Sequence, residues 1–210
     1  MKKWLWFILL LGLVFRLIWL PNFPPGLTPD EASFGYDAYS ILKTGRDQWG
    51  KLMPLTLESF GDFKPPLYAY LDIPFVAVLG LTKTAVRLPN VLFGVGAIYA
   101  TYLLTKKLFS NEKAALLSAA LLAISPWHIA MSRGAFEANL TTLLLPLGIY
   151  FWLEKKYSWS GFILGLNLFS YHSARLVTPL IALSLFYFFR PKINKQFFRG
   201  AVNFWPKEIK

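Results

Sequence analysis

The chain contains no cysteine, so no disulfide can staple it, and cysteine usage does not indicate its redox compartment. Histidine is scarce, and His128 has no second histidine at metal-ligand spacing, which leaves a zinc site unsupported. The sequence also lacks a glycine-rich loop that could cradle phosphates, an internal repeat and a low-complexity tract. The missing phosphate loop argues against a nucleotide-driven pump and against soluble nucleotide-sugar chemistry.

Acidic residues are few, with 11 against 22 lysines and arginines. The resulting charge of +11 could indicate a nucleic-acid partner, but the basic residues stand in short clusters between hydrophobic runs. Clusters so placed are topology signals, and their partner is the anionic membrane surface. The composition is 55% hydrophobic and 18% aromatic, with a mean hydropathy of +0.44. These values indicate a membrane protein whose partner is the lipid bilayer and not nucleic acid.

The N-terminus resembles a signal peptide, because Lys2-Lys3 precede an apolar run that ends at Leu20. A small-residue cleavage site is missing, and the proline-rich residues 21–25 follow instead. We therefore expect an uncleaved signal anchor whose N-terminus is cytoplasmic. Arg16, near the outer end of this span, is expected to snorkel to the interface.

A short helix is predicted to restart over residues 28–44. Thr28 suits the N-cap, Pro29 the first helical position and Glu31 the reciprocal position of a capping box, and Gly45 suits the C-terminal end. The segment is too short and polar to span a bilayer, so we expect it to lie along the outer membrane surface.

The next basic pair, Lys106-Lys107, places the end of the run 85–105 in the cytoplasm. The apolar residues 67–81 contain Asp72 and Pro74 and read either as a span or as an interfacial or re-entrant helix. Because the run 85–105 must travel inward, we favour the second interpretation. The predicted spans are residues 4–20, 85–105, 114–131, 138–153, 159–171 and 176–189.

The sequence thus predicts an all-α, polytopic transmembrane helical bundle over residues 1–192, with a juxtamembrane helix in its first external loop. Residues 46–65 are predicted to form an irregular external loop, and residues 193–210 a cytoplasmic tail. The last two spans are shorter than the roughly 20 residues that a crossing helix needs, so they must tilt, thin the bilayer or hide part of the loop between them. The same orientation rule places these charged residues outside: Asp30, Glu31, Lys64, Arg87, Arg133, Glu137, His172 and Arg175.

Two interpretations remain open for the external acids. Asp30 could act as a general base, or simply place a favourable charge at a helix N-terminus; Glu31 could join it, or serve only the capping box. Glu137 could be a third acid of the site, or an ion-pair partner of Arg133 at helical spacing.

The external cations carry a similar ambiguity. Taken singly, an arginine or lysine at this interface usually snorkels or meets lipid head groups. Taken together, four such cations and His172 opposite two carboxylates suit a phosphate-bearing lipid substrate.

The order of motifs resembles that of a known family. The motifs are Pro29-Asp30-Glu31, Lys64-Pro65-Pro66-Leu67-Tyr68, Val86-Arg87-Leu88-Pro89, and Ser132-Arg133 followed by Phe136-Glu137. Over nearly the whole chain this order resembles the N-terminal half of the GT-C class of integral-membrane glycosyltransferases. The nearest kin are the protein O-mannosyltransferase-like and aminoarabinose-transferase-like enzymes of glycosyltransferase family 39.

The resemblance implies a donor sugar carried on polyprenyl phosphate, an acceptor hydroxyl on a protein, lipid or glycan, and a reaction on the outer face of the plasma (inner) membrane. It implies that Asp30 is the catalytic base and that Glu31 is its neighbour in the acceptor site. Lys64 and Arg87 would touch the donor phosphate or shape its pocket.

Glu137 stands where relatives have an aspartate after Ser-Arg, and His172 and Arg175 lie where relatives often carry another basic residue. Family members have further transmembrane helices, so the resemblance implies that this chain is the N-terminal part of a longer protein. The sequence implies no certain cofactor and leaves open whether a divalent metal assists.

Two other functions are compatible with parts of the sequence. A lipid-linked sugar flippase would need charged residues along a path through the bilayer midplane, whereas the predicted spans carry charge chiefly at their ends. An inactive fragment or a non-catalytic membrane subunit would be compatible with the short C-terminal part.

Overall fold

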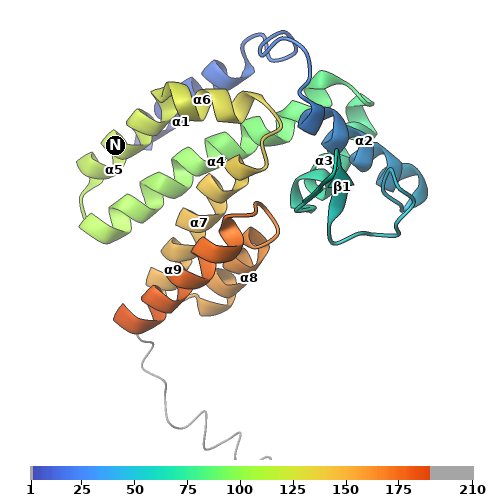
Figure 1. The fold of residues 1–210 in the computed structure, drawn as a ribbon. Helices are drawn as coiled ribbons and strands as arrows, with labels where there is room; N and C mark the ends of the chain where they lie inside the picture. Colours follow the sequence, from blue (N-terminus) through green and yellow to red (C-terminus); the bar gives the residue numbers. More distant parts are fainter. Residues whose placement is uncertain (1, 190–210) are drawn as a thin grey trace, which may run out of the picture.

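In the computed structural model, which describes residues 2–189, the longest element is helix α4 (Lys83–Phe109). Its 27 residues correspond to about 40 Å of helix. Thr82 begins the helix by accepting a hydrogen bond from the Ala85 amide, and Ser110 ends it in the left-handed conformation. The other elements are arranged around this helix (Figure 1).

Helices α1 (Lys2–Leu17), α5 (Glu112–Ile124) and α6 (Pro126–Arg133) lie alongside α4 (Figure 1). Small buried side chains on α5, such as Ala119 and Ala123, let these helices approach closely. The chain bends by 58° between α5 and α6. The bend falls at Ser125-Pro126, where the serine caps α6 and proline occupies its first position.

Helix α2 (Pro29–Thr44) has the predicted ends. Thr28 accepts a hydrogen bond from the Glu31 amide, and the Glu31 carboxylate accepts one from the Thr28 amide, so the capping box is present. Gly45 ends the helix with a φ of +70°, a conformation that glycine adopts without steric cost.

The prediction of an irregular loop over residues 46–65 is partly wrong. It contains an antiparallel hairpin of β1 (Leu57–Ser59) and β2 (Asp62–Lys64). Both turn residues, Phe60 and Gly61, have positive φ, which is the turn geometry that matches the twist of a tight hairpin. The hairpin lies beside α2 and directly precedes α3 (Leu67–Leu79).

Helices α7 (Ala138–Leu153), α8 (Tyr157–Asn167) and α9 (Ala174–Phe188) complete the fold, and α7 packs against both α4 and α8. Where α2, α3, α4, α7 and α8 meet, a core forms from apolar side chains that are distant in sequence. It includes Phe34, Tyr68, Val86, Leu140 and Ile163.

Within the described residues, only α4 is long and apolar enough by length and composition to cross a membrane alone; the bent pair α5–α6 also qualifies if it is one span. Helices α3, α7 and α9 are apolar but shorter. The 13 residues of α3 correspond to about 20 Å, less than the roughly 30 Å of a hydrocarbon core. The predicted set of six spans therefore stays a prediction.

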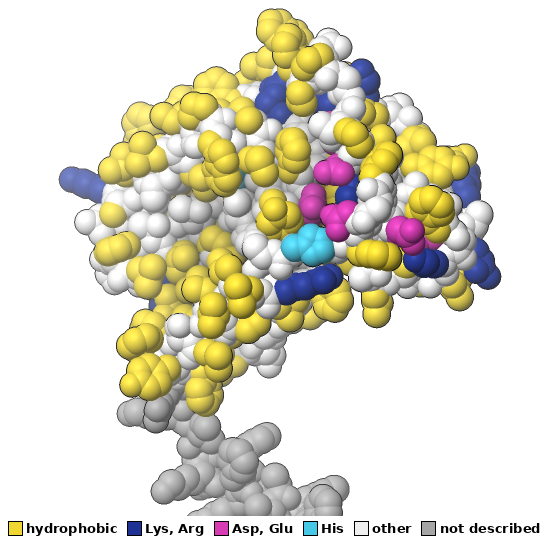
Figure 2. Space-filling model, in the orientation of Figure 1, with side chains coloured by type: hydrophobic (Ala, Val, Ile, Leu, Met, Phe, Trp, Pro, Cys, Tyr) yellow, Lys and Arg dark blue, Asp and Glu magenta, His cyan; other side chains and the backbone are white. Residues whose placement is uncertain are grey.

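Large apolar side chains cover much of the surface that Figure 2 displays. Trp6 is 71% exposed, and other exposed apolar residues include Leu117, Leu183 and Phe188. Apolar surface of this extent marks a protein that contacts lipid or partners. The predicted cytoplasmic tail, residues 193–210, lies outside the described residues.

Candidate functional site

The centre of the candidate site is an ion pair between Asp30 in the first turn of α2 and Lys64 at the end of β2. The Lys64 Nζ lies 2.5 Å from the Asp30 Oδ1. The two partners differ in exposure: the Asp30 side chain is 54% exposed, and the Lys64 side chain is 6% exposed. A solvent-facing carboxylate is therefore held by a cation that comes from inside the protein.

The β-hairpin positions Lys64. Its ammonium also donates to the Ser59 hydroxyl at 3.1 Å, and it lies 5.1 Å from the centre of the Phe34 ring. An ammonium has three N–H donors, so these contacts leave one donor unused. Since Ser59 and Lys64 stand on paired strands, the hairpin brings the lysine to α2.

Glu137, immediately before α7, lies close to this pair. Burial raises the pKa of Glu137, and the neighbouring Asp30 charge raises it further, whereas Lys64 and His172 act in the opposite direction. His172 is exposed. Figure 2 shows acidic side chains gathered beside a histidine and a basic side chain. The structure thus brings Asp30, Lys64, Glu137 and His172 together from four separate segments.

Asp37, two turns further along α2, is an acid that the sequence reasoning did not select. It is buried and accepts hydrogen bonds from the Gln48 backbone and side chain at 3.0 and 3.3 Å. Burial raises its pKa to about 6. Asp30 and Asp37 are seven residues apart, which places them on one face of a helix. This spacing is the sequence signal that could have identified Asp37.

Glu31 points away from Asp30 into a fully buried ion pair with Arg87. The Arg87 Nε donates to the Glu31 Oε1 at 2.8 Å, and both side chains are 0% exposed. Glu31 also accepts from the Thr28 and Ala135 amides. Burial alone would raise the pKa of Glu31, but the bonds from Arg87 and the two amides outweigh it, and the pKa is lowered.

The predicted substrate-binding role of Arg87 conflicts with this geometry. Besides Glu31, its guanidinium donates to the carbonyls of Leu20, Pro24 and Gly26, so all five N–H donors are engaged. Arg87 therefore joins the segment after α1 to α2 and α4, and only the alternative that it shapes the pocket is compatible with the structure. Glu31, predicted to be catalytic, likewise lies in a buried ion pair and not beside the exposed Asp30 carboxylate, and its role stays a prediction.

Arg133 also lies apart from the Asp30 cluster. Its guanidinium donates to the Phe15 and Phe23 carbonyls at 2.9 and 3.1 Å, which ties the end of α6 to the end of α1. The described residues hold no Arg133–Glu137 ion pair. Arg175 is an exposed residue in the first turn of α9 and makes no side-chain hydrogen bond or ion pair with the cluster among residues 2–189, so its role remains a prediction.

The expectation that Arg16 snorkels is wrong, because its side chain is completely buried. It donates to the Gly12, Leu122 and Ala123 carbonyls and to His128 Nδ1 at 2.7 Å. The last carbonyls of α5, which the bend leaves without helical partners, are thereby satisfied. Since His128 Nδ1 accepts this bond, its other nitrogen donates to Thr142.

A metal site is not evident in the described part of the chain, where no three His, Cys, Asp or Glu residues are grouped so as to hold an ion. The site consists instead of an exposed carboxylate, a second acid of raised pKa and nearby cations. Such a set can accept a proton and bind an anionic group.

Comparison with known proteins gives two matches. The model of a family described as dolichyl-phosphate-mannose-protein mannosyltransferase matches residues 63–202. A protein of Aquifex aeolicus (strain VF5) described as "Uncharacterized protein" is 27% identical over 143 residues, which cover 68% of this chain and 26% of that protein. The chain therefore spans about a quarter of the length of this curated relative. No solved structure matches.

Proposed function

The chain belongs to the dolichyl-phosphate-mannose-protein mannosyltransferase family, and from this premise we propose that it moves a sugar from a polyprenyl-phosphate donor to an acceptor hydroxyl on the extracytoplasmic face. The family supports a membrane glycosyltransferase in general. The donor, the face and the residues are our proposal. The observation that carries it is the exposed Asp30 carboxylate beside Lys64, Glu137 and His172.

The distribution of charge supports the proposed orientation. Lys106 and Lys107 end α4, and Lys155-Lys156 follow α7, whereas the Asp30 cluster lies by the opposite ends of both helices. Loops rich in lysine face the cytoplasm. The cluster would then face outward in a GT-C type bundle, where a lipid-linked donor can enter from the membrane.

In the proposed reaction the Asp30 carboxylate accepts the proton of the acceptor hydroxyl. The acceptor oxygen attacks the anomeric carbon, and the bond from that carbon to the phosphate oxygen breaks. The electron pair leaves with the polyprenyl phosphate, and a single displacement of this kind inverts the anomeric configuration. General-base assistance of this type accelerates reactions by about 10²- to 10⁴-fold.

Lys64 would donate a hydrogen bond to the leaving phosphate, since one of its N–H donors is unused and its ammonium lies next to the Asp30 base. His172 and Arg175 are exposed at the start of α9 and would supply further positive charge. Cations placed where charge develops stabilise the transition state. Arg87 and Arg133 act at a distance by holding the segment from α1 to α2.

Replacement of the proposed base is the direct test. We expect Asp30→Asn to lower transfer from a polyprenyl-phosphate mannose donor by about 10²-fold or more, with donor binding retained. Transfer and donor binding are measured on the same purified membranes. The matched control is Asp62→Asn, which changes another exposed aspartate outside the cluster and should leave transfer unchanged.

Equal transfer by the Asp30→Asn variant would remove Asp30 from the role of base. Donor binding without sugar release by the unmodified chain would favour the non-catalytic subunit. Movement of the donor across vesicles without sugar release would favour a flippase. The buried polar groups do not support a flippase path, since Arg16, Asn90, His128 and Asn139 are 0% exposed.

A further inference from the structure

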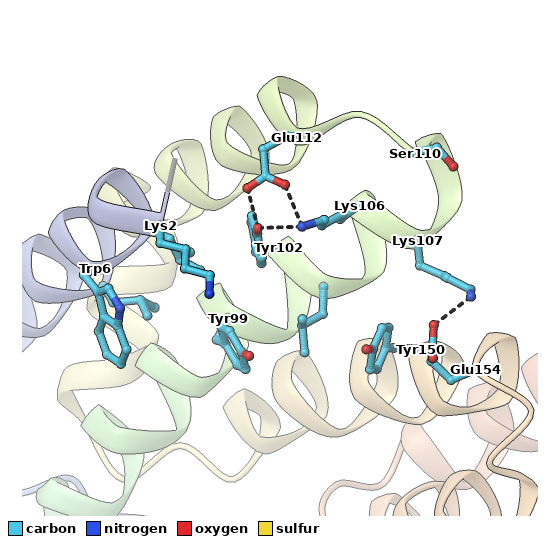
Figure 3. A pocket seen from close by; sticks show the side chains of 13 residues that line it. Lys2, Trp6, Tyr99, Tyr102, Lys106, Lys107, Ser110, Glu112, Tyr150 and Glu154 are labelled. Atoms are coloured by element: carbon cyan, nitrogen blue, oxygen red, sulfur yellow. Dashed lines mark hydrogen bonds and ion pairs between the residues drawn. The ribbon is translucent and has the colours of Figure 1, made fainter.

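A large cavity lies at the end of α4 that is distant from Asp30. Its volume is about 1330 Å³, and α1, α4, α5 and α7 contribute its lining. In Figure 3, Lys2 points from α1 toward Tyr99 of α4, with Tyr150 of α7 further along the same wall. A small-molecule pocket usually measures about 300–1,000 Å³, so this cavity can hold a larger ligand.

The lining includes both polar and apolar side chains. Lysines and glutamates at the ends of α4, α5 and α7 form the polar part, whereas Leu5, Leu9 and Leu103 form an apolar wall between α1 and α4. Tyr99 and Tyr102 stack along α4, with ring centres 6.3 Å apart. A ligand that fits both parts has a polar head and a hydrocarbon tail.

The charge of the lining indicates the sign of that head. Two of its lysines are neutralised, because Lys106 pairs with Glu112 at 2.6 Å and Lys107 pairs with Glu154 at 2.7 Å (Figure 3). Lys2 has no ion pair or hydrogen bond among residues 2–189. The lining therefore carries a surplus of one positive charge, which matches the single negative charge of a phosphodiester.

We propose that this cavity binds one anionic phospholipid, with the phosphodiester at Lys2 and the Tyr99 and Tyr150 hydroxyls and the first part of the acyl chains against the leucines of α1 and α4. Basic pockets between transmembrane helices on the cytoplasmic side are known to bind such head groups. The Lys106-Lys107 end of α4 lies at the same level, where the positive-inside rule places the inner leaflet.

The test compares two neighbouring lysines. Lys2→Gln removes the unpaired charge of the cavity, whereas Lys3→Gln removes an equal charge beside it that does not line the cavity. The full chain is purified in mild detergent, and bound phosphatidylglycerol and phosphatidylcholine are counted by native mass spectrometry. We expect the unmodified chain and Lys3→Gln to retain phosphatidylglycerol preferentially, and Lys2→Gln to retain about fivefold less.

Equal retention of the two lipids by the unmodified chain would overturn the proposal, as would equal losses in the two lysine variants. If Lys2→Gln fails to insert, Leu103→Trp fills the apolar wall instead and should displace the lipid; undiminished binding by this variant would also refute the site. The readout requires no sugar transfer, so failure here and failure of the proposed reaction are distinguishable.

Discussion

Two adjacent carboxylates on α2 have different surroundings because consecutive side chains of a helix point in directions about 100° apart. Asp30 faces the solvent and meets Lys64, whereas Glu31 turns inward to Arg87. A charge buried beyond the reach of water requires a partner, and Glu31 has a guanidinium and two amides. Glu31 thus anchors α2, and the role proposed for Asp30 falls to the exposed neighbour.

We predict that Glu31→Gln acts on stability and not on the chemical step. It leaves the buried Arg87 charge without compensation, which should cost about 3 kcal/mol or more of unfolding free energy. Thermal unfolding in detergent measures this loss. Glu58→Gln is the control, because it breaks the exposed Lys51–Glu58 pair and should cost less than about 1 kcal/mol.

The loss in Glu31→Gln should depend on pH. The pKa of Glu31 is lowered in the folded protein, so its ionised form stabilises the fold above the unfolded pKa near 4.5. That contribution is lost as the pH falls through the lowered value. A difference between variant and unmodified chain that stays constant from pH 7 to well below pH 4 would contradict the assignment.

Helix α2 packs closely against α4 because residue 35 is a glycine and has no side chain. A Cβ atom built on Gly35 would lie 2.5 Å from the Val86 Cγ2 and 3.3 Å from the Leu81 Cδ1. Because Val86 is β-branched and 1% exposed, it has little freedom to move aside. The glycine therefore sets the distance between α2 and α4.

We predict that Gly35→Ala destabilises the chain by about 1–3 kcal/mol through this overlap. Helix propensity alone predicts the opposite sign, a gain of about 1 kcal/mol. Gly35→Ala should cost less unfolding free energy in the Val86→Ala background than in the unmodified chain, because the shorter side chain removes the overlap. Thermal unfolding measures both costs. A stabilised Gly35→Ala would indicate that α2 and α4 are not in close contact.

The sequence predicted most of these elements because their signals are local. The capping box of Thr28 and Glu31, and the left-handed Gly45, involve residues only a few positions apart. The hairpin was missed because it consists of two three-residue strands without alternating polarity. Hydrophobic periodicity cannot detect segments that short.

The site was predicted less completely, since its contacts join distant residues. Glu31 and Arg87 are 56 positions apart, and Arg16 and His128 are 112 apart. Position near the outer end of a span predicted that these arginines face solvent or substrate. Only the three-dimensional structure reveals the carbonyl groups that surround them.

At the scale of the whole molecule, the two ends of α4 differ in chemistry. One end lies beside the acids of the candidate site, and the other carries Lys106-Lys107 and the large cavity. The positive-inside rule therefore predicts one orientation in a membrane, with the Lys106-Lys107 end in the cytoplasm.

Single cysteines can test this orientation, since the chain has no native cysteine to interfere. We predict that Phe60→Cys in the hairpin turn, where the side chain is 77% exposed, reacts with a membrane-impermeant maleimide on intact cells. Phe109→Cys, at a site 69% exposed, should react only after permeabilisation. Both should react in detergent; the reverse pattern on intact cells would place Asp30 in the cytoplasm.

The guanidinium of Arg87 bonds to chain segments made before it, through Leu20, Pro24, Gly26 and Glu31. The Glu31 carboxylate in turn accepts a hydrogen bond from the later Ala135 amide. During biosynthesis, the ribosome completes this junction only when residue 135 has been added. A nascent polypeptide that has delivered only its first hydrophobic segment and α2 holds an acid whose counterion has not yet been translated. Translation arrested before residue 87 therefore leaves α2 without its counterion, whereas a chain released after residue 135 holds every group of this junction.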